Sequence, residues 1–177
     1  MKKTFVIAGA GKLGTILAQA WLDGFLPEYE LIGIYGRSRE NTTRLARRTG
    51  CPAYFDLHEL LLYRPDYLAE AAGPECVKEI AIPFLHAGTN LLLLSIGALA
   101  APGFYGELET AARQGNARIH LCSGAIGGFD VLRTAALMGN SSAGITSQKA
   151  AGELRHTPVY SEVLLAAKQT VFSGTAR

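Results

Sequence analysis

The sequence has few of the residues that mark a metal-binding or disulfide-stapled protein. It contains three cysteines, and these are widely spaced at Cys51, Cys76 and Cys122. No CxxC pair is present, so we expect no zinc site and no other metal centre. An odd, scattered set of thiols is typical of a reducing compartment, so the sequence favours a cytoplasmic protein.

Excess charge and long apolar runs are missing as well. The formal net charge is +2, which is too close to neutral to predict nucleic-acid binding by bulk electrostatics. The apolar run at 91–94 is far below membrane-spanning length. The apolar run behind the basic start gives way to glycine at 9–11, so it does not predict a signal peptide. We therefore expect neither nucleic acid nor a membrane as a partner.

What the sequence does contain is a regular alternation of buried strands and helices. Hydrophobic residues make up 49% of its 177 residues, enough for one domain, or one domain plus part of another. Apolar runs typical of strands buried on both faces occur at 4–8, 31–35, 66–71, 91–95 and 118–121. Segments with helical spacing lie between them, at 13–21, 41–48, 75–87 and 104–114. We expect Asn41 to cap the second helix and Pro83 to kink or shorten the third. The alternation predicts an α/β fold, a Rossmann-type doubly wound parallel sheet.

The composition of the sequence changes after Ser123. A glycine-rich segment at 124–128, which we call the glycine crossing, precedes a further helix at 129–138 and a polar stretch at 139–144. We place a domain boundary near 121–128. The interpretation is a dinucleotide-binding Rossmann domain at 1–121 and a partial α+β substrate or oligomerisation domain at 122–177.

A glycine motif follows the first strand and opens the first helix. Its six residues match GxGxxG and are Gly9, Ala10, Gly11, Lys12, Leu13 and Gly14. In a dinucleotide site, the first glycine allows the tight turn, the second lets the pyrophosphate approach the backbone, and the third lets the helix pack close to the sheet. The N–H groups at the helix start then face the phosphates. An ordinary glycine turn is the alternative, but the strand before the motif and the helix after it favour a dinucleotide site.

The end of the second strand indicates which dinucleotide is bound. Enzymes that use NAD usually place a carboxylate there to bond the ribose 2′-hydroxyl, whereas this sequence reads Tyr35-Gly36-Arg37-Ser38-Arg39. The guanidinium of Arg37 and the hydroxyl of Ser38 suit a 2′-phosphate, so the sequence favours NADP. The alternative is that the arginines are surface residues and NAD is bound. The further arginines at 44, 47 and 48 are interpreted as a solvated helix face.

Three more segments follow predicted strands, and ligands of open parallel sheets sit beyond the carboxyl ends of the strands. We expect Ala71 and Ala72, and Gly97 and Ala98, to line the nicotinamide pocket. The third segment precedes a helix, so its backbone N–H groups are placed to hold a substrate carboxylate. It consists of Ser123, Gly124, Ala125, Ile126 and Gly127.

At these motifs the sequence resembles the L-aspartate dehydrogenase family. The matching segments are the GxGxxG at Gly9, Glu70-Ala71-Ala72, the Ser-x-Gly-Ala-Leu ending at Leu99, the Ser-Gly-Ala-Ile-Gly-Gly-x-Asp at 123–130, and the closing segment at 171–177. The resemblance thus covers nearly the whole chain.

The resemblance implies a two-domain homo-oligomer that oxidises L-aspartate, a small dicarboxylic amino acid, with NAD(P). The product, iminoaspartate, hydrolyses to oxaloacetate and ammonia. It also implies that the family's substrate domain, with the histidine regarded as catalytic, continues past the point that matches Arg177. For a chain truncated there relative to the family, a catalytically silent dinucleotide-binding protein is the alternative to a dehydrogenase.

Two residues near the glycine crossing are weak candidates for catalysis. His120 lies just before the crossing, and strand alternation gives it an even chance of facing the cleft. Cys122 stands where the family usually has proline. A thiol beside a helix start is able to act as a nucleophile, as in a semialdehyde dehydrogenase, although a small buried cysteine is the more common finding.

Overall fold

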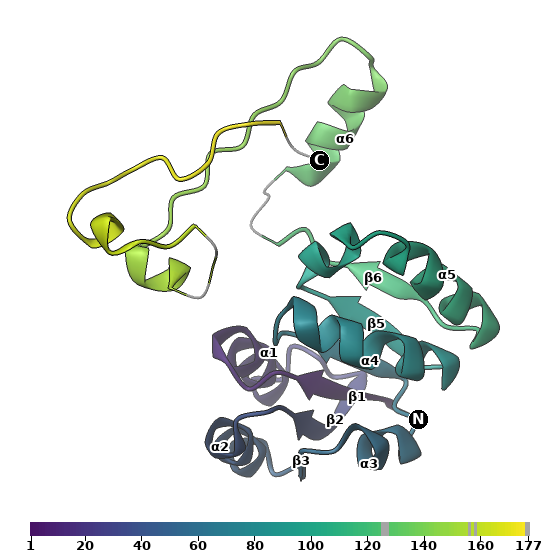
Figure 1. Ribbon diagram of the computed structural model, residues 1–177. Coiled ribbons are helices and arrows are strands. Elements are labelled where there is room, and N and C mark those ends of the chain that lie inside the picture. The colour runs from purple at the N-terminus through teal and green to yellow at the C-terminus, as the bar shows by residue number, and fades with distance from the viewer. Residues whose placement is uncertain (125–127, 156, 158, 176–177) are drawn as a thin grey trace. The chain divides into compact units, whose positions relative to one another are not determined.

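A computed structural model describes residues 1–124, 128–155, 157 and 159–175. By its contacts the chain divides into two compact units, Met1–Gly127 and Gly128–Arg177. The first unit holds the sheet with its helices (Figure 1).

The sheet of the first unit has six strands in the order β3-β2-β1-β4-β5-β6, and every pairing is parallel. The strands are β1 (Lys3–Ala8), β2 (Tyr29–Tyr35), β3 (Ala53–Tyr54), β4 (Tyr67–Glu70), β5 (Asn90–Leu93) and β6 (Ile119–Leu121). Strand order runs outward from β1 to β3 and then resumes on the other side of β1 with β4. This is the Rossmann order, so the expected fold class is confirmed. It places a switch point between the carboxyl ends of β1 and β4.

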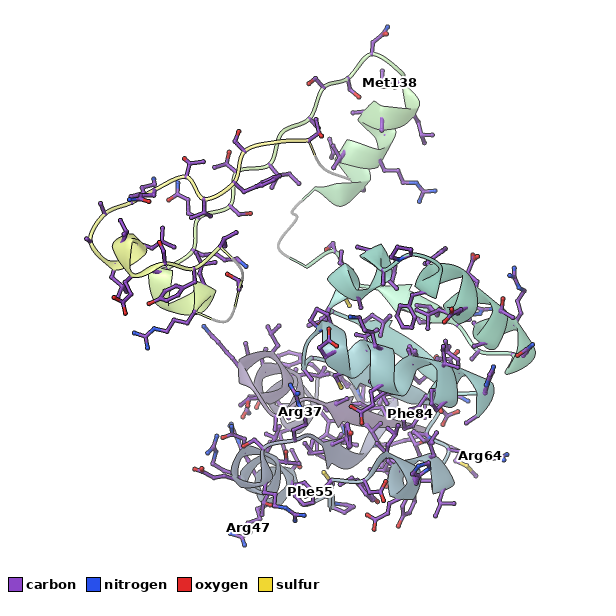
Figure 2. The ribbon with its side chains drawn as sticks, in the orientation of Figure 1. Arg37, Arg47, Phe55, Arg64, Phe84 and Met138 are labelled. Carbon is purple, nitrogen blue, oxygen red and sulfur yellow. The ribbon has the colours of Figure 1, made fainter. Side chains whose placement is uncertain are left out.

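Helices cover both faces of this sheet (Figure 1). They are α1 (Lys12–Leu22), α2 (Arg39–Thr49), α3 (Leu57–Leu62), α4 (Pro74–His86) and α5 (Phe104–Gln114), with a short 3₁₀ helix η1 (Ile96–Ala100). Side chains of β1 alternate between two buried clusters: Ile7 packs in the cluster shared with α1 and α2, and Val6 in the cluster shared with α3, α4 and α5. Phe84 of α4, labelled in Figure 2, is fully buried in the second cluster.

Two helix expectations are corrected by the structure. Ser38, not Asn41, caps α2: its hydroxyl accepts a hydrogen bond from the backbone N–H of Asn41 at 3.3 Å. Helix α4 passes through Pro83 and ends only at His86. Pro83 cannot donate a hydrogen bond to the carbonyl four residues earlier, but the fully buried Phe84 and Leu85 hold the last turn in the core.

Strand β3, helix α3 and the 3₁₀ helix η1 have no counterpart among the expected elements. Strand β3 has two residues and helix α3 has six. Neither is long enough to show a period of hydrophobic residues, which is why the sequence pattern did not reveal them.

The second unit contains helix α6 (Phe129–Leu137) and two 3₁₀ helices, η2 (Ala151–Leu154) and η3 (Glu162–Leu165). None of its described residues is buried. Between 128 and 175, the described part of this unit is helical or irregular, and the strands expected of an α+β domain are not seen there. Across the residues that the structure describes, no helix is both long and apolar enough to cross a membrane.

Candidate dinucleotide-binding site

A cavity of about 250 Å³ opens at the switch point of the sheet. Its walls come from the turn after β1, the connection from β2 to α2, the loop after β4 and the first turns of α4. Seven of the residues expected to bind the cofactor line it: Gly9, Ala10, Gly11, Arg37, Ser38, Ala71 and Ala72. The structure therefore brings together segments that are more than sixty residues apart in the sequence.

The turn after β1 needs glycine at its first position for two reasons. Gly9 has a φ of +119°, which L side chains rarely adopt. A Cβ there would also lie 2.6 Å from the carbonyl carbon of Ala71. Backbone hydrogen bonds fix this close approach, from Gly9 to Tyr35 at 2.8 Å and from Ala71 to Ala8 at 2.7 Å.

The other two glycines of the motif differ in what surrounds them. A Cβ on Gly14 would lie 1.8 Å from the carbonyl oxygen of Gly9, so Gly14 sets how closely α1 packs against the turn. A Cβ on Gly11 would meet no atom within 4 Å. The bare backbone of Gly11 thus borders open space in the cavity, where a pyrophosphate would need to approach.

The start of α1 is free to take an anion. Gly11 is the N-cap, no side chain in the described part of the chain bonds the first N–H groups, and the first turn has no acidic residue. The N–H groups of the first turn and the positive end of the helix dipole therefore lie next to Gly11, which lines the cavity. These residues fit a dinucleotide phosphate. Lys12 and Leu13 of the same turn are exposed and do not line the cavity.

Of the two arginines after β2, only Arg37 lines the cavity (Figure 2 labels it). Arg37 is exposed and forms no ion pair within the described residues. The guanidinium of Arg39 instead stacks 4.6 Å from the ring centroid of Phe55. Arg44, Arg47 and Arg48 of α2 are exposed, which confirms the interpretation of a solvated helix face.

A buried carboxylate joins the loops after β4 and β5. Glu70 has no exposed surface, and its Oε1 accepts hydrogen bonds from the backbone of Ala72 and Gly73, each at 2.7 Å. Its Oε1 also accepts a hydrogen bond from the Ser95 hydroxyl, and its Oε2 accepts one from the Ser95 backbone N–H, each at 2.9 Å. Such a fully bonded charge holds both loops in one geometry. Gly97 and Ala98 follow in η1 but do not line the cavity, and Ala98 is buried in the core.

The sequence analysis missed six of the residues that line the cavity: Tyr35, Gly36, Asn41, Thr42, Cys76 and Glu79. The phenol of Tyr35 donates a hydrogen bond to Glu79 Oε1 at 3.0 Å. Burial, with the Glu79 bond second, raises the pKa of Tyr35 to about 12. Burial, with the nearby carboxylates Glu70 and Glu79, raises the pKa of Cys76 to about 12. The spacing of three between Cys76 and Glu79, which puts them on one helix face, was the available signal.

The two weak catalytic candidates lie on or just after the edge strand β6, and neither lines the cavity. His120 is exposed, with its ring centroid 6.4 Å from that of Tyr67. Cys122 is half-buried, and its backbone N–H donates to the carbonyl of Leu93 at 3.0 Å.

Of the segment expected to bind substrate, Ser123 and Gly124 are exposed. Ala125, Ile126 and Gly127 lie outside the described residues. Where side chains are described, no three His, Cys, Asp or Glu residues gather in a way that could hold a metal ion.

Comparison with known proteins bears on both the fold and the family. A family model described as "Homoserine dehydrogenase, NAD binding domain" matches residues 9–122. Two curated L-aspartate dehydrogenases are similar to the chain. The protein from Cupriavidus taiwanensis is 38% identical over 64% of this chain and 44% of its own length. That from Methanocella arvoryzae is 34% identical over 86% of this chain and 56% of its own length. These matches confirm the resemblance drawn from the motifs.

Solved structures share the fold. A hyperthermophilic archaeal homoserine dehydrogenase in complex with NADPH aligns with a TM-score of 0.54 at 24% identity, over 68% of this chain and 44% of its own. GenD2 from gentamicin A biosynthesis, in complex with NAD, aligns with a TM-score of 0.59 at 21% identity, over 78% and 39%. The chain spans about half the length of the curated relatives it matches.

Proposed function

Because this chain belongs to the family of the homoserine dehydrogenase NAD-binding domain, we propose that it is an NADP-preferring oxidoreductase of the L-aspartate dehydrogenase type. The domain binds a nicotinamide dinucleotide. The observation that carries the proposal is the cavity at the switch point, where the glycine turn, Arg37 and the loop after β4 meet.

The residues of this cavity divide the work of holding the cofactor. The N–H groups at the start of α1 take the pyrophosphate, which Gly11 lets approach the backbone. Ala71 packs directly against Gly9, and Ala72, held by Glu70, continues that wall of the cavity. When bound, the nicotinamide ring supplies the hydride acceptor or donor that these side chains lack.

The preference for NADP rests on Arg37 and Ser38. A guanidinium in the cavity attracts a 2′-phosphate, and the last residue of β2 is a tyrosine rather than a carboxylate. The similar structures do not decide the matter, because one holds NADPH and the other NAD. Ser38 contributes less than Arg37, since its hydroxyl already caps α2.

For the substrate we propose a small dicarboxylic amino acid, L-aspartate, because the curated relatives carry that name. The exposed Ser123 and Gly124 then contribute backbone N–H groups to a substrate carboxylate. A homo-oligomer is proposed on the same resemblance. We assign no general acid or base, because neither His120 nor Cys122 borders the cavity.

The cofactor preference is tested by titrating NADPH and NADH against the wild-type protein and Arg37→Ala, following nucleotide fluorescence. We expect NADPH to bind the wild type about tenfold more tightly, and Arg37→Ala to lose that margin while NADH binding stays within about twofold. The matched control is Arg47→Ala, an exposed arginine outside the cavity, which should leave both affinities unchanged. Tighter binding of NADH by the wild type would show that the preference is wrong.

Activity is tested by following dinucleotide absorbance with L-aspartate. Turnover supports the dehydrogenase proposal. Binding of dinucleotide without turnover supports a silent binding protein instead. Turnover of an aldehyde that is lost in Cys122→Ser would support the acyl-transfer alternative.

A further inference from the structure

The cavity holds a carboxylate that the proposed cofactor chemistry has not used. Glu79 lies in the second turn of α4, and its side chain reaches the same cavity as Arg37 and Ser38, which come from the connection after β2. Its Oε1 accepts the phenol hydrogen of Tyr35 at 3.0 Å. Its second oxygen, Oε2, has no hydrogen-bond partner among the described residues.

We propose that Glu79 is a specificity-determining residue, whose Oε2 accepts a hydrogen bond from the exocyclic amino group of the cofactor's adenine. This inference rests on the proposed function, because it concerns the adenosine half of the same dinucleotide. It assigns to this site a selection for adenine over a purine that carries a carbonyl at the same position.

The charges of the cavity favour the adenine base, rather than a phosphate, as the group that Glu79 contacts. A carboxylate accepts hydrogen bonds and repels phosphate, so Glu79 suits a neutral donor. Arg37, on a different connection of the sheet, is the cation suited to the 2′ substituent. Besides the ribose hydroxyls, the adenine amino group is the neutral donor that the adenosine half offers to the carboxylate. Hypoxanthine has a carbonyl oxygen in place of the amino group. A carbonyl oxygen and a carboxylate are both acceptors, so they form no hydrogen bond with each other.

Tyr35 acts as a positioning residue in this scheme. It is buried at the end of β2, and its phenol, whose pKa is raised to about 12, is protonated near neutral pH. The Tyr35 hydrogen bond therefore holds the exposed Glu79 side chain in one orientation before the nucleotide binds. A carboxylate fixed in advance loses less conformational entropy when the base arrives.

The test compares NADPH with its hypoxanthine analogue, nicotinamide hypoxanthine dinucleotide phosphate in the reduced form. We expect the wild type to bind NADPH on the order of tenfold more tightly, a margin suited to a partly exposed site. In Glu79→Ala the ratio of the two dissociation constants should fall to within about twofold of one. Glu79→Gln should also lose the ratio, since its amide donates to the carbonyl. Tyr35→Phe should give an intermediate value.

The matched control is Glu75→Ala, one turn earlier on the same helix. Glu75 pairs with Lys78 at 2.8 Å and does not line the cavity, so its loss should leave the ratio as in the wild type. Thermal melting of each variant shows that the fold is kept.

The outcomes separate the inference from the proposed function. A Glu79→Ala protein that keeps the wild-type ratio overturns the inference, as does a wild type that binds both purines equally. The inference is also overturned if Glu79→Ala binds NADH and the hypoxanthine analogue of NADH more weakly by the same factor. The carboxylate would then bond a ribose hydroxyl. A wild type that binds no dinucleotide at all overturns the proposed function itself.

Discussion

Asp66 gathers the polar contacts that join the start of β4 to the start of β1. Its Oδ2 accepts from the backbone N–H of Thr4 at 2.9 Å, and its Oδ1 from the ammonium of Lys3 at 2.8 Å. The Thr4 hydroxyl completes the set, since it accepts from the Asp66 N–H at 3.0 Å. Asp66 thus fixes the register between β1 and β4, the two strands that flank the switch point.

The contacts of Asp66 make stability depend on pH. The hydrogen bonds from Lys3 and from the Thr4 backbone lower the pKa of Asp66 below its ordinary value of 3.8. A carboxyl group whose pKa is lower in the folded protein contributes stability above its unfolded pKa, and this contribution is lost as the pH falls through the folded value. The effect therefore concerns the window below about pH 4.

We predict that Asp66→Asn lowers the free energy of unfolding by about 1–2 kcal/mol at neutral pH. The difference from the wild type should shrink when the pH is lowered below about 4, towards the folded pKa of the wild-type carboxyl group. Urea unfolding at neutral pH and below about pH 4 measures it. Glu75→Gln, which removes a single exposed ion pair, should change stability by less than about 0.5 kcal/mol. An equal loss for Asp66→Asn at both pH values would contradict the assignment.

At the scale of elements, two glycines in the segment that joins β1 to α1 have different roles: Gly14 serves packing and Gly11 serves binding. Gly14 and Gly11 both belong to the GxGxxG motif, but a Cβ meets backbone at 1.8 Å on Gly14 and nothing within 4 Å on Gly11. The backbone of Gly11 is in an extended conformation with φ of −82°, so alanine causes no strain there.

We predict that Gly14→Ala destabilises the fold and that Gly11→Ala weakens only binding. The first change forces α1 away from the turn and should cost about 1–3 kcal/mol. The second should leave the free energy of unfolding within about 1 kcal/mol, while NADPH affinity falls tenfold or more because the methyl group stands where the pyrophosphate approaches. Thermal unfolding and fluorescence titration of both variants give the comparison. Unchanged affinity in a folded Gly11→Ala protein would place the phosphates elsewhere.

At the scale of the whole molecule, the residues of the cavity all lie within one unit. Its lining runs from Gly9 to Glu79, and both buried clusters consist of residues up to Ile119. The second unit, Gly128–Arg177, has no buried residue in its described part. The core and the cavity of the first unit therefore do not require the second.

We predict that residues 1–127, expressed alone, fold and bind NADPH with a dissociation constant within about twofold of the full chain. The measurement is fluorescence titration beside a thermal melt of both proteins. A fragment that melts cooperatively but binds ten times more weakly would show that residues after 127 complete the cofactor site.

The sequence by itself determined the parts of this protein that depend on local periodicity. Apolar runs marked the strands of the sheet other than β3, and the glycine spacing marked the turn after β1, because each signal is contained in a short stretch of chain. The Rossmann class followed from the alternation of these elements. The cap of α2 was misplaced because Ser38 and Asn41 both suit that role, and only backbone geometry chooses between them.

The tertiary structure alone decided which side chains share the cavity. The Tyr35–Glu79 hydrogen bond joins residues 44 positions apart, and Glu70 reaches Ser95 across 25 positions. These pairings depend on how α4 packs on the sheet and on which loops meet beyond the strand ends. No sequence period carries that information, because strand order and helix docking are settled by packing between elements that are distant in the chain.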